Sequence, residues 1–430
     1  MRQWRSLGYK LAGSLTALGL VSWLVGCSTA EALRVPLHPA HPHAQVPGVS
    51  PMPASPMPTV DPRLVTANTR FGFKLFSEVA KARPGENLMI SPASVAIALS
   101  MTYTGARGET QQAMARALEL SGMTLADLNQ ANADLERVLE NADPHVQVAI
   151  ANSLWGRQDF RFRPEFLQQS QQFYNARVER LDFSTPAAVR TINNWVSEHT
   201  QGKIPTMLDQ ISAQDVLFLI NAIYFKGDWQ RQFNPRDTVQ RPFTQWDGST
   251  KPHPLMSQRG HFSYQETEQF QAIRLPYGNG RLTMVVILPK SNFTTFLSRL
   301  TPENWQTWRQ QFRSREGSIQ LPKFKQEFGL SLNDALKAMG MAIAFEPGQA
   351  DFSGISDRQT FISNVQHKTL IEVNEAGTEA AAATSVGITA TSIQLDPPFA
   401  MVCDRPFFYA IEDSETGSLL FMGTVVAPQV

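Results

Sequence analysis

Four small side chains recur at every second position of one segment of this chain: Thr378, Ala380, Ala382 and Thr384. Side chains alternate between the two faces of an extended strand, so these four would share one face and could enter a sheet without a steric clash. The alanine run at 380–383 favours a helix as well, and Gly377 frees the backbone where the run begins. A segment that can be loop, helix or central strand predicts a conformational switch.

The side chains that most often carry catalysis do not fall into a catalytic spacing. Ser, His and Asp residues are numerous, but their positions indicate no pairing of a nucleophile with a base. The sequence has no G-x-S-x-G, H-E-x-x-H or C-x-x-C motif and no phosphate-binding loop. We therefore expect no catalytic residues, no metal and no cofactor, and a function other than that of an enzyme.

The elements that would position the segment can be read from periodicity. Ser91 and Pro92 are typical of the N-cap and first turn of a helix. Other helical patterns cover 71–80, 110–120, 164–174 and 187–200, and strand patterns cover 146–155, 216–225, 282–288, 319–328, 361–373, 399–411 and 418–426. Helices and strands mix without a regular βαβ alternation, which predicts an α+β fold.

Blocks of sequence from about residue 66 to the end resemble the serpin family and occur in the family's order. They are Asn87–Thr110 (NLMISPASVAIALSMTYTGARGET), Ile150–Trp155 (IANSLW), Ile192–Ile204 (INNWVSEHTQGKI), Asn221–Trp229 (NAIYFKGDW), Leu321–Lys325 (LPKFK), His367–Thr378 and Met401–Ile411 (MVCDRPFFYAI). The resemblance implies a serpin fold, with three β-sheets surrounded by about nine helices and an exposed C-terminal reactive loop at about residues 375–398.

The resemblance also implies a mechanism. A target serine protease, or a cysteine protease, attacks a loop carbonyl, and the cleaved loop inserts into the main sheet while it still acylates the protease. The family's usual register places the scissile bond at Thr391-Ser392; Ala390-Thr391 is an alternative, and Ile388 is another if the register slips. No Arg or Lys lies between Gly377 and Asp396, so we expect an elastase-like or subtilisin-like target rather than a trypsin-like one.

Other residues match structural positions of the family. The hinge comprises Glu375, Gly377, Thr378, Glu379, Ala380, Ala381, Ala382 and Ala383. Ser91, Ser94, Asn221 and His367 match the shutter, where polar side chains hydrogen-bond beneath the sheet that opens. Trp229 matches a tryptophan at the top of that sheet, and Lys323 and Glu375 match a salt bridge where insertion begins.

The alternative function is that of a non-inhibitory serpin that binds a ligand or a partner. Non-inhibitory relatives often carry bulky or charged residues in the hinge, whereas this chain has Thr378 followed by a run of alanines. The hinge sequence therefore favours inhibition.

The N-terminus has the pattern of an export signal. Arg2, Arg5 and Lys10 precede the apolar run Leu11–Leu24, which is too short to span a membrane comfortably. The run ends in Leu-Val-Gly-Cys27, which resembles a bacterial lipobox and implies cleavage before Cys27 and lipidation of its thiol. An ordinary signal peptide with an incidental cysteine is the alternative.

Composition completes the expected organisation. Residues 28–62 are rich in proline, which predicts an extended linker. We expect a signal peptide at 1–26, lipidated Cys27 with its linker to residue 62, and a serpin domain at 63–430. The formal net charge is zero, so we expect no nucleic-acid partner. The expected product is a monomeric bacterial protein that is exported and held on the periplasmic or cell-surface side of a membrane, with release to the extracellular space as a further option.

Overall fold

The computed structural model describes residues 58–378 and 397–430, and the described residues belong to one compact unit. Helix α1 (Pro62–Ala82) begins one residue before the expected boundary at 62/63, and the Asp61 carboxylate caps it by accepting the Arg63 N–H. The expected lipidation site Cys27, the hinge residues Glu379, Ala380, Ala381, Ala382 and Ala383, and the reactive-bond residues Ala390, Thr391 and Ser392 lie outside the described residues.

A six-stranded sheet forms one half of the architecture. Its strands, in spatial order, are β10 (Phe324–Ser331), β11 (Asn364–Val373), β12 (Gly377–Thr378), β4 (Leu217–Asp228), β2 (Val146–Arg157) and β3 (Arg177–Leu181). All but two residues of β4 are buried, as expected for a central strand covered on both faces. β4 is antiparallel to β2 but parallel to β11, so the sheet is mixed.

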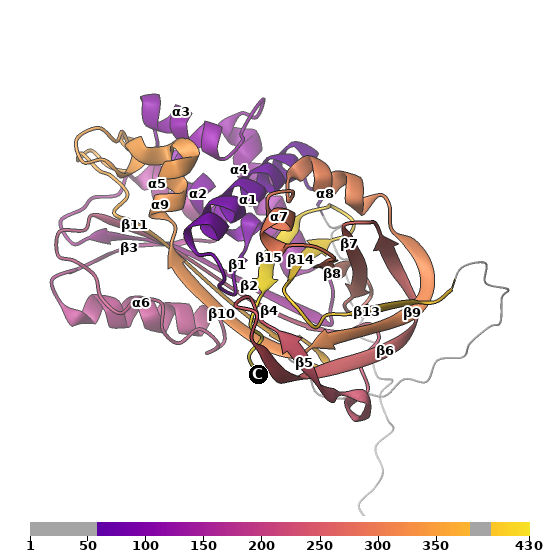
Figure 1. Cartoon of the computed structure of the whole chain (residues 1–430). Helices are drawn as coiled ribbons and strands as arrows, with labels where there is room; N and C mark the ends of the chain where they lie inside the picture. Colours follow the sequence, from indigo (N-terminus) through magenta and orange to yellow (C-terminus); the bar gives the residue numbers. More distant parts are fainter. Residues whose placement is uncertain (1–57, 379–396) are drawn as a thin grey trace, which may run out of the picture. The chain divides into compact units, whose positions relative to one another are not determined.

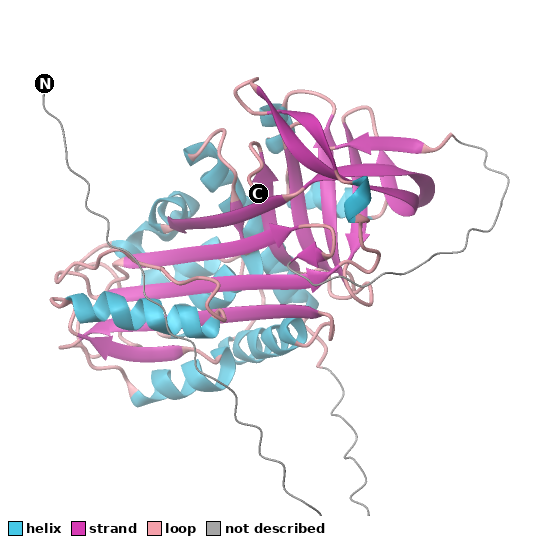
Figure 2. Ribbon diagram, turned by 90° about the horizontal axis from the view of Figure 1, so that it is seen from below, coloured by secondary structure: helices cyan, strands magenta, loops and turns pink. Residues whose placement is uncertain are grey.

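Helices cover both faces of this sheet. Figure 2 shows α6 (Pro186–His199) across one face and the other helices behind the opposite face. Trp195 of α6 packs edge-to-face on Trp155 of β2, with ring centroids 6.0 Å apart. Helix α2 (Pro92–Thr104) lies on the other face and is buried over almost its whole length, because it is apolar all round.

The remaining helices complete an α+β fold. They are α3 (Gly108–Ala117), α4 (Leu125–Glu140), α5 (Pro164–Tyr174), α7 (Phe293–Leu297), α8 (Pro302–Arg309) and α9 (Asn333–Leu336). The described residues therefore contain nine α-helices, in agreement with the expected number, and Figure 1 shows them grouped mainly on one side of the strands.

The other strands form a second hydrogen-bonded network. Its strands are β1 (Met89–Ile90), β15 (Leu419–Val425), β14 (Phe407–Asp413), β8 (Leu282–Pro289), β7 (Phe270–Pro276), β6 (Thr250–Glu266), β9 (Arg313–Pro322), β13 (Phe399–Val402) and β5 (Val239–Thr244). Hydrogen bonding thus joins the described strands into two networks where three sheets were expected. The reason is β6, which pairs with β9 along Leu255–Tyr264 and with β7 along Ser263–Glu266, so that two groups of strands share it.

Two predicted strands are each divided in the structure. The run 319–328 is split at Lys323 into the end of β9, which pairs with β6, and the start of β10, which pairs with β11. The run 399–411 is likewise split into β13 and β14. Both halves of each run are apolar, so periodicity alone does not reveal a corner between two sheets.

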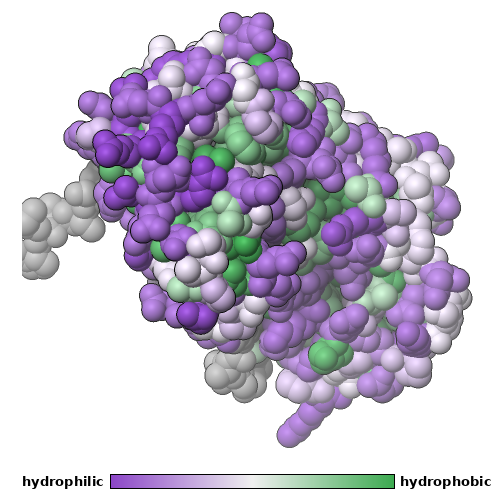
Figure 3. All heavy atoms as spheres, turned by 90° about the vertical axis from the view of Figure 1, so that its left-hand side faces the viewer, coloured by the Kyte–Doolittle hydropathy of each residue, from purple (hydrophilic) through white to green (hydrophobic). Residues whose placement is uncertain are grey.

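The outer surface is largely polar. Figure 3 shows hydrophilic side chains over most of the face at the left of Figure 1, with smaller apolar patches between them. Within the described residues, no helix combines the length and apolar character needed to cross a bilayer.

Candidate functional site

The six-stranded sheet is split at one end by the two-residue strand β12. Thr378 pairs with Val373 of β11 and with Gly227 of β4, and both pairings are antiparallel. Farther along, from Leu370 to Asn364, β11 pairs directly with β4 in parallel. The start of the small-residue segment therefore already lies between the two strands, as a short wedge at one end of the sheet.

A tight turn at 374–376 reverses the chain from β11 into β12. The Asn374 side-chain oxygen accepts hydrogen bonds from the N–H groups of Ala376 (3.0 Å) and Gly377 (3.3 Å). The Asn374 N–H donates to the Gly377 carbonyl at 2.9 Å. Asparagine side chains commonly hold turns in this way, so the turn is specified by its own sequence.

Gly377 is required by the close approach of β12 to β4. Its φ is +155°, a conformation that L side chains rarely adopt, and a Cβ there would lie 2.1 Å from the Gly227 carbonyl oxygen. That oxygen belongs to the backbone of a central strand, so it cannot move aside as a flexible side chain could. Only glycine fits at this position in the observed arrangement.

A chain of contacts anchors Thr378. The Thr378 side chain is fully buried, and its hydroxyl lies 3.0 Å from the Tyr277 hydroxyl. The Tyr277 ring stacks on the Trp229 indole, with centroids 4.3 Å apart and planes 11° from parallel. The indole N–H donates to the Asn374 carbonyl at 2.9 Å. Burial raises the pKa of Tyr277, so its phenol stays protonated and can donate to Thr378.

An ion pair holds the outside of the same turn. Lys323 Nζ lies 2.9 Å from Glu375 Oε2, and the Thr238 hydroxyl donates to Glu375 Oε1 at 2.8 Å. Burial opposes ionisation of Glu375, but the hydrogen bonds from Lys323 and Thr238 outweigh it and leave the pKa of the carboxyl below its usual value. Only 14% of the Glu375 side chain is exposed, so solvent screens this pair less than a surface pair.

A second group of polar residues lies in the middle of the sheet. Asn152 of β2, Asn221 of β4 and His367 of β11 are register neighbours in one row. The Asn221 amide nitrogen donates to the Asn152 side-chain oxygen (2.6 Å) and to Ser94 Oγ (2.5 Å), and the Asn221 side-chain oxygen lies 2.6 Å from His367 Nδ1. The Ser91 N–H donates to His367 Nε2 at 3.1 Å.

These contacts fix the protonation of His367. Because the side-chain oxygen of Asn221 only accepts, Nδ1 of His367 carries the proton, and Nε2 accepts from Ser91. Burial lowers the pKa of His367 to about 3, so the ring is neutral near pH 7. Ser91 also caps α2, since its Oγ accepts the Ser94 N–H at 3.4 Å. Through Ser91 and Ser94, this row of side chains therefore connects the first turn of α2 to the part of the sheet where β4 and β11 are direct neighbours.

The structure thus places the predicted residues that it describes in two groups along β4 and β11. Trp229, Lys323, Glu375, Gly377 and Thr378 gather at the split end, and Ser91, Ser94, Asn221 and His367 gather at mid-sheet.

Four further site residues, Asn374, Asn152, Tyr277 and Thr238, were not found from the sequence; Thr238 is 137 residues from its partner Glu375. Asn374 had a local signal, because an asparagine between a strand pattern and a glycine is typical of a turn. Asn152 and Tyr277 had none: Asn152 is 69 residues from Asn221, and Tyr277 is 101 residues from Thr378. Only the folded chain brings these partners together.

The chemistry available in this site is conformational. Among residues 58–378 and 397–430, no group of three or more His, Cys, Asp or Glu side chains is arranged to hold a metal ion. Cys403 is fully buried, and burial raises the pKa of its thiol, which fits a small apolar core residue rather than a nucleophile. What the site can do is lengthen or release a strand at the split end of the sheet.

Comparisons with known proteins agree on the kind of protein. A family model described as "Serpin (serine protease inhibitor)" matches residues 66–428. The "Leukocyte elastase inhibitor" of Bos taurus is 36% identical over 382 residues, which cover 85% of this chain and 100% of the relative. The human protein of the same name is 34% identical over 381 residues, again with 85% of this chain and 100% of the relative covered.

A solved structure extends the likeness to three dimensions. The crystal structure of tengpin, a thermophilic serpin in its native state, matches with a TM-score of 0.79 and 32% sequence identity. The match covers 87% of this chain and 96% of tengpin. Identity of this degree over nearly the whole fold goes beyond a general likeness of architecture.

Proposed function

The chain belongs to the serpin family, and from this premise we propose that it inhibits a serine protease by suicide-substrate trapping. The observation that carries the proposal is the position of β12. Gly377 and Thr378 run antiparallel to both β11 and β4, so a longer strand could follow the same path without any change of direction. The protease would cleave the chain beyond Thr378, and the freed segment would extend β12 down the sheet.

The strand register indicates where each inserted residue would lie. Thr378 is opposite Val373 and Gly227, so in an unbroken ladder residue 384 would lie opposite His367 and Asn221. The Thr378 side chain points into the core, and alternation would turn Ala380, Ala382 and Thr384 to the same side. These side chains are small, which fits a strand that enters a packed interior.

Insertion exchanges one pairing for two. β11 and β4 would separate along Asn364–Leu370, where they now pair directly, and the contact between His367 and Asn221 would open. The new strand would then form hydrogen bonds with both neighbours. Each hydrogen bond gained in this exchange would stabilise the inserted form by about 0.5–1.5 kcal/mol. We infer that the native state is held by the barrier to separating the strands rather than by lying lowest in free energy.

The protease would be carried along with the acylated end of the loop. From Thr378 to Thr391 an extended chain spans on the order of 45 Å, at about 3.3 Å per residue. Dragging the protease that far while it is covalently attached would deform its oxyanion hole. The loss of one oxyanion-hole donor slows such chemistry by a factor of about 10²–10³, which is enough to trap the acyl-enzyme.

The length of the sheet favours cleavage at Thr391-Ser392. Continuing the register places residue 387 opposite Asn364, where β11 begins. Cleavage at Ile388 would place the protease against the end of the sheet, whereas Thr391 leaves residues 389–391 as a spacer. Ala390-Thr391 remains close enough to be an alternative bond. The uncharged residues here and the names of the leukocyte elastase inhibitors support a target that prefers small apolar side chains.

The test is to mix the purified chain with pancreatic elastase and with subtilisin and to analyse the products on a denaturing gel. We expect a covalent band at the summed mass, and mass spectrometry of the released C-terminal peptide identifies the scissile bond. A chain that is cut without forming the band, and whose melting temperature does not rise after cleavage, would contradict trapping and favour a non-inhibitory serpin.

We further propose that the protein is a bacterial lipoprotein anchored through Cys27. The support is the lipobox-like sequence and the apolar run before it. The expected result is that the chain made in a bacterial host partitions into the detergent phase, whereas the Cys27→Ala variant partitions into the aqueous phase. Equal partitioning of the two forms would favour an ordinary signal peptide.

A further inference from the structure

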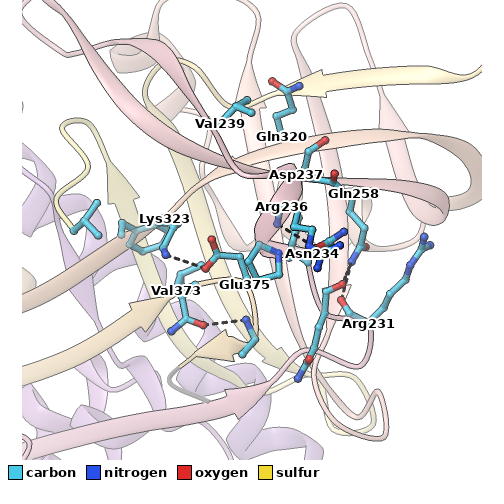
Figure 4. Close-up of a pocket in the computed structure, with 18 of the residues that line it drawn as sticks. Arg231, Asn234, Arg236, Asp237, Val239, Gln258, Gln320, Lys323, Val373 and Glu375 are labelled. Carbon is cyan, nitrogen blue, oxygen red and sulfur yellow. Dashed lines mark hydrogen bonds and ion pairs between the residues drawn. The ribbon is translucent and has the colours of Figure 1, made fainter. Parts of the chain in front are cut away.

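A wide groove lies directly beside the turn at 374–376. Its volume is about 1330 Å³, and Figure 4 shows its lining side chains converging from three sides. One wall is the face of β5, β6 and β9, the second is the connector 231–237, and the third is the end of β10 and β11 with the turn itself. The proposed inhibition gives no role to the first two walls.

The groove is cationic although the whole chain has a formal net charge of zero. The basic side chains that line it are Arg231, Arg236, Arg241, Arg259, Lys323 and Lys325, and the acidic side chains are Asp237, Glu372 and Glu375. Of the basic residues, only Lys323 forms an ion pair within the described part of the chain, with Glu375. Arg231 donates a hydrogen bond to the Arg259 carbonyl. The other four, Arg236, Arg241, Arg259 and Lys325, are exposed and line the groove with no carboxylate partner among the described residues.

These cations come from different elements that the fold holds in place. Arg241 lies on β5 and Arg259 on β6, and Ser257 of β6 is opposite Gln320 of β9 in the ladder. The connector is fixed to this face, because the Gln258 amide donates to the carbonyls of Arg231 (2.8 Å) and Gln232 (2.9 Å). The arrangement is therefore set by backbone pairing and not by a flexible loop alone.

We propose that this groove binds a small polyanion, a molecule with several phosphate, sulfate or carboxylate groups. Guanidinium groups match the geometry of these anions and bind them through paired hydrogen bonds. Each exposed pair contributes little by itself, because water screens it. A ligand must therefore engage several of the cations at once, so a single phosphate ion binds much more weakly than a linked series.

The groove is coupled to the hinge through Lys323. Lys323 lines the groove and also holds Glu375, whose carbonyl accepts the Phe233 N–H at 2.8 Å. A polyanion in the groove competes with Glu375 for Lys323 and repels the Glu375 carboxylate. Binding thus loosens the turn at 374–376 and, with it, the hold on β12.

The first experiment titrates the full chain with inorganic tripolyphosphate by calorimetry at low ionic strength, with orthophosphate and a disulfated disaccharide in parallel. The Arg236→Gln/Arg241→Gln/Arg259→Gln variant removes three groove charges. The matched control, Arg116→Gln/Arg190→Gln/Arg299→Gln, removes three exposed arginine charges outside the groove. We expect tripolyphosphate to bind the parent and the control equally and the groove variant about 10- to 100-fold more weakly.

The outcomes separate the claims. Equal binding to the parent and the groove variant, or no binding to the parent, would overturn the site. Tighter binding of the disulfated disaccharide than of tripolyphosphate would identify a sulfated saccharide as the source of the anion, and the reverse order a polyphosphate. Hydrogen exchange at the Ala376 and Gly377 amides reports the coupling between the groove and the turn without any protease. We expect faster exchange with ligand bound, and unchanged exchange at saturation would overturn the coupling. Failure of inhibition with normal binding would count only against the proposed function.

Discussion

The hydroxyl of Thr378 lies 3.0 Å from that of Tyr277, and both residues are fully buried. This contact joins Thr378 of β12 to a residue that lies 101 positions earlier in the chain. Tyr277 in turn stacks on Trp229, which donates to the carbonyl of Asn374. The two residues of β12 are thus held between β11 and β4, and the contacts that hold them can be tested one at a time.

Replacing Tyr277 by Phe should destabilise the native state by about 1–3 kcal/mol, because it leaves the Thr378 hydroxyl buried without this partner. The measurement is the free energy of native-state unfolding in urea. The matched control is Thr378→Val, and in the double variant the loss should be smaller than the sum of the two single losses. Additive losses would show that the two hydroxyls do not interact.

Thr378→Arg should convert the protein from an inhibitor into a substrate. An arginine cannot be buried where Thr378 is 0% exposed without a large desolvation cost, so both the wedge and its extension would be opposed. The measurement is the yield of covalent complex relative to cleaved chain on a denaturing gel. Thr378→Ser keeps the hydroxyl and should trap like the parent; a Thr378→Arg variant that traps equally well would contradict insertion.

Much of the local structure could be predicted from the sequence, because helices and caps are determined by nearby residues. The helix at 164–174 has the predicted bounds, and Ser91 caps α2 as its position before Pro92 indicates. The family resemblance identified the ion pair of Lys323 with Glu375 as a contact to look for, and the two groups are 2.9 Å apart.

Long-range pairing could not be predicted in the same way. Nothing near Asn152 in the sequence indicates that it neighbours Asn221, since strand order decides which residues of β2 and β4 share a row. The break at Lys323 was missed for a related reason: β9 and β10 have similar patterns but pair with different strands, β6 and β11. The residues that line the cationic groove are also brought together by strand pairing, so the groove cannot be recognised in the linear sequence.

His367 should make stability depend on pH. Its folded-state pKa, about 3, is below the usual value of 6.5, so below pH 6.5 the unfolded chain takes up a proton that the folded chain does not. The contribution is therefore constant above pH 6.5 and is lost as the pH falls from 6.5 towards 3. The free energy of unfolding of the parent should therefore exceed that of His367→Gln by about 2 kcal/mol less at pH 5 than at pH 7.

The measurement is urea unfolding at a series of pH values. If the His367→Gln profile were parallel to that of the parent, His367 would not be held neutral by burial at mid-sheet.

Gly377→Ala should expel β12 from the sheet. The added Cβ would lie 2.1 Å from the Gly227 carbonyl oxygen and 2.6 Å from the Asp228 Cα, and neither backbone atom can move without disturbing a central strand. The Thr378 hydroxyl would then leave Tyr277, and the stacking of Trp229 would change. The measurement is hydrogen exchange at residues 374–378 together with tryptophan fluorescence.

Gly122→Ala separates the steric clash from the cost of the backbone conformation. Gly122 also has a positive φ, +71°, but a Cβ there meets nothing within 4 Å, so its replacement should cost only the conformational strain of about 1 kcal/mol. Because an extended β12 would keep the same neighbour on β4, Gly377→Ala should reduce trapping as well as release the wedge. If Gly377→Ala released the wedge but trapped the protease as well as the parent, the inserted strand would have to follow a path other than the one that β12 begins.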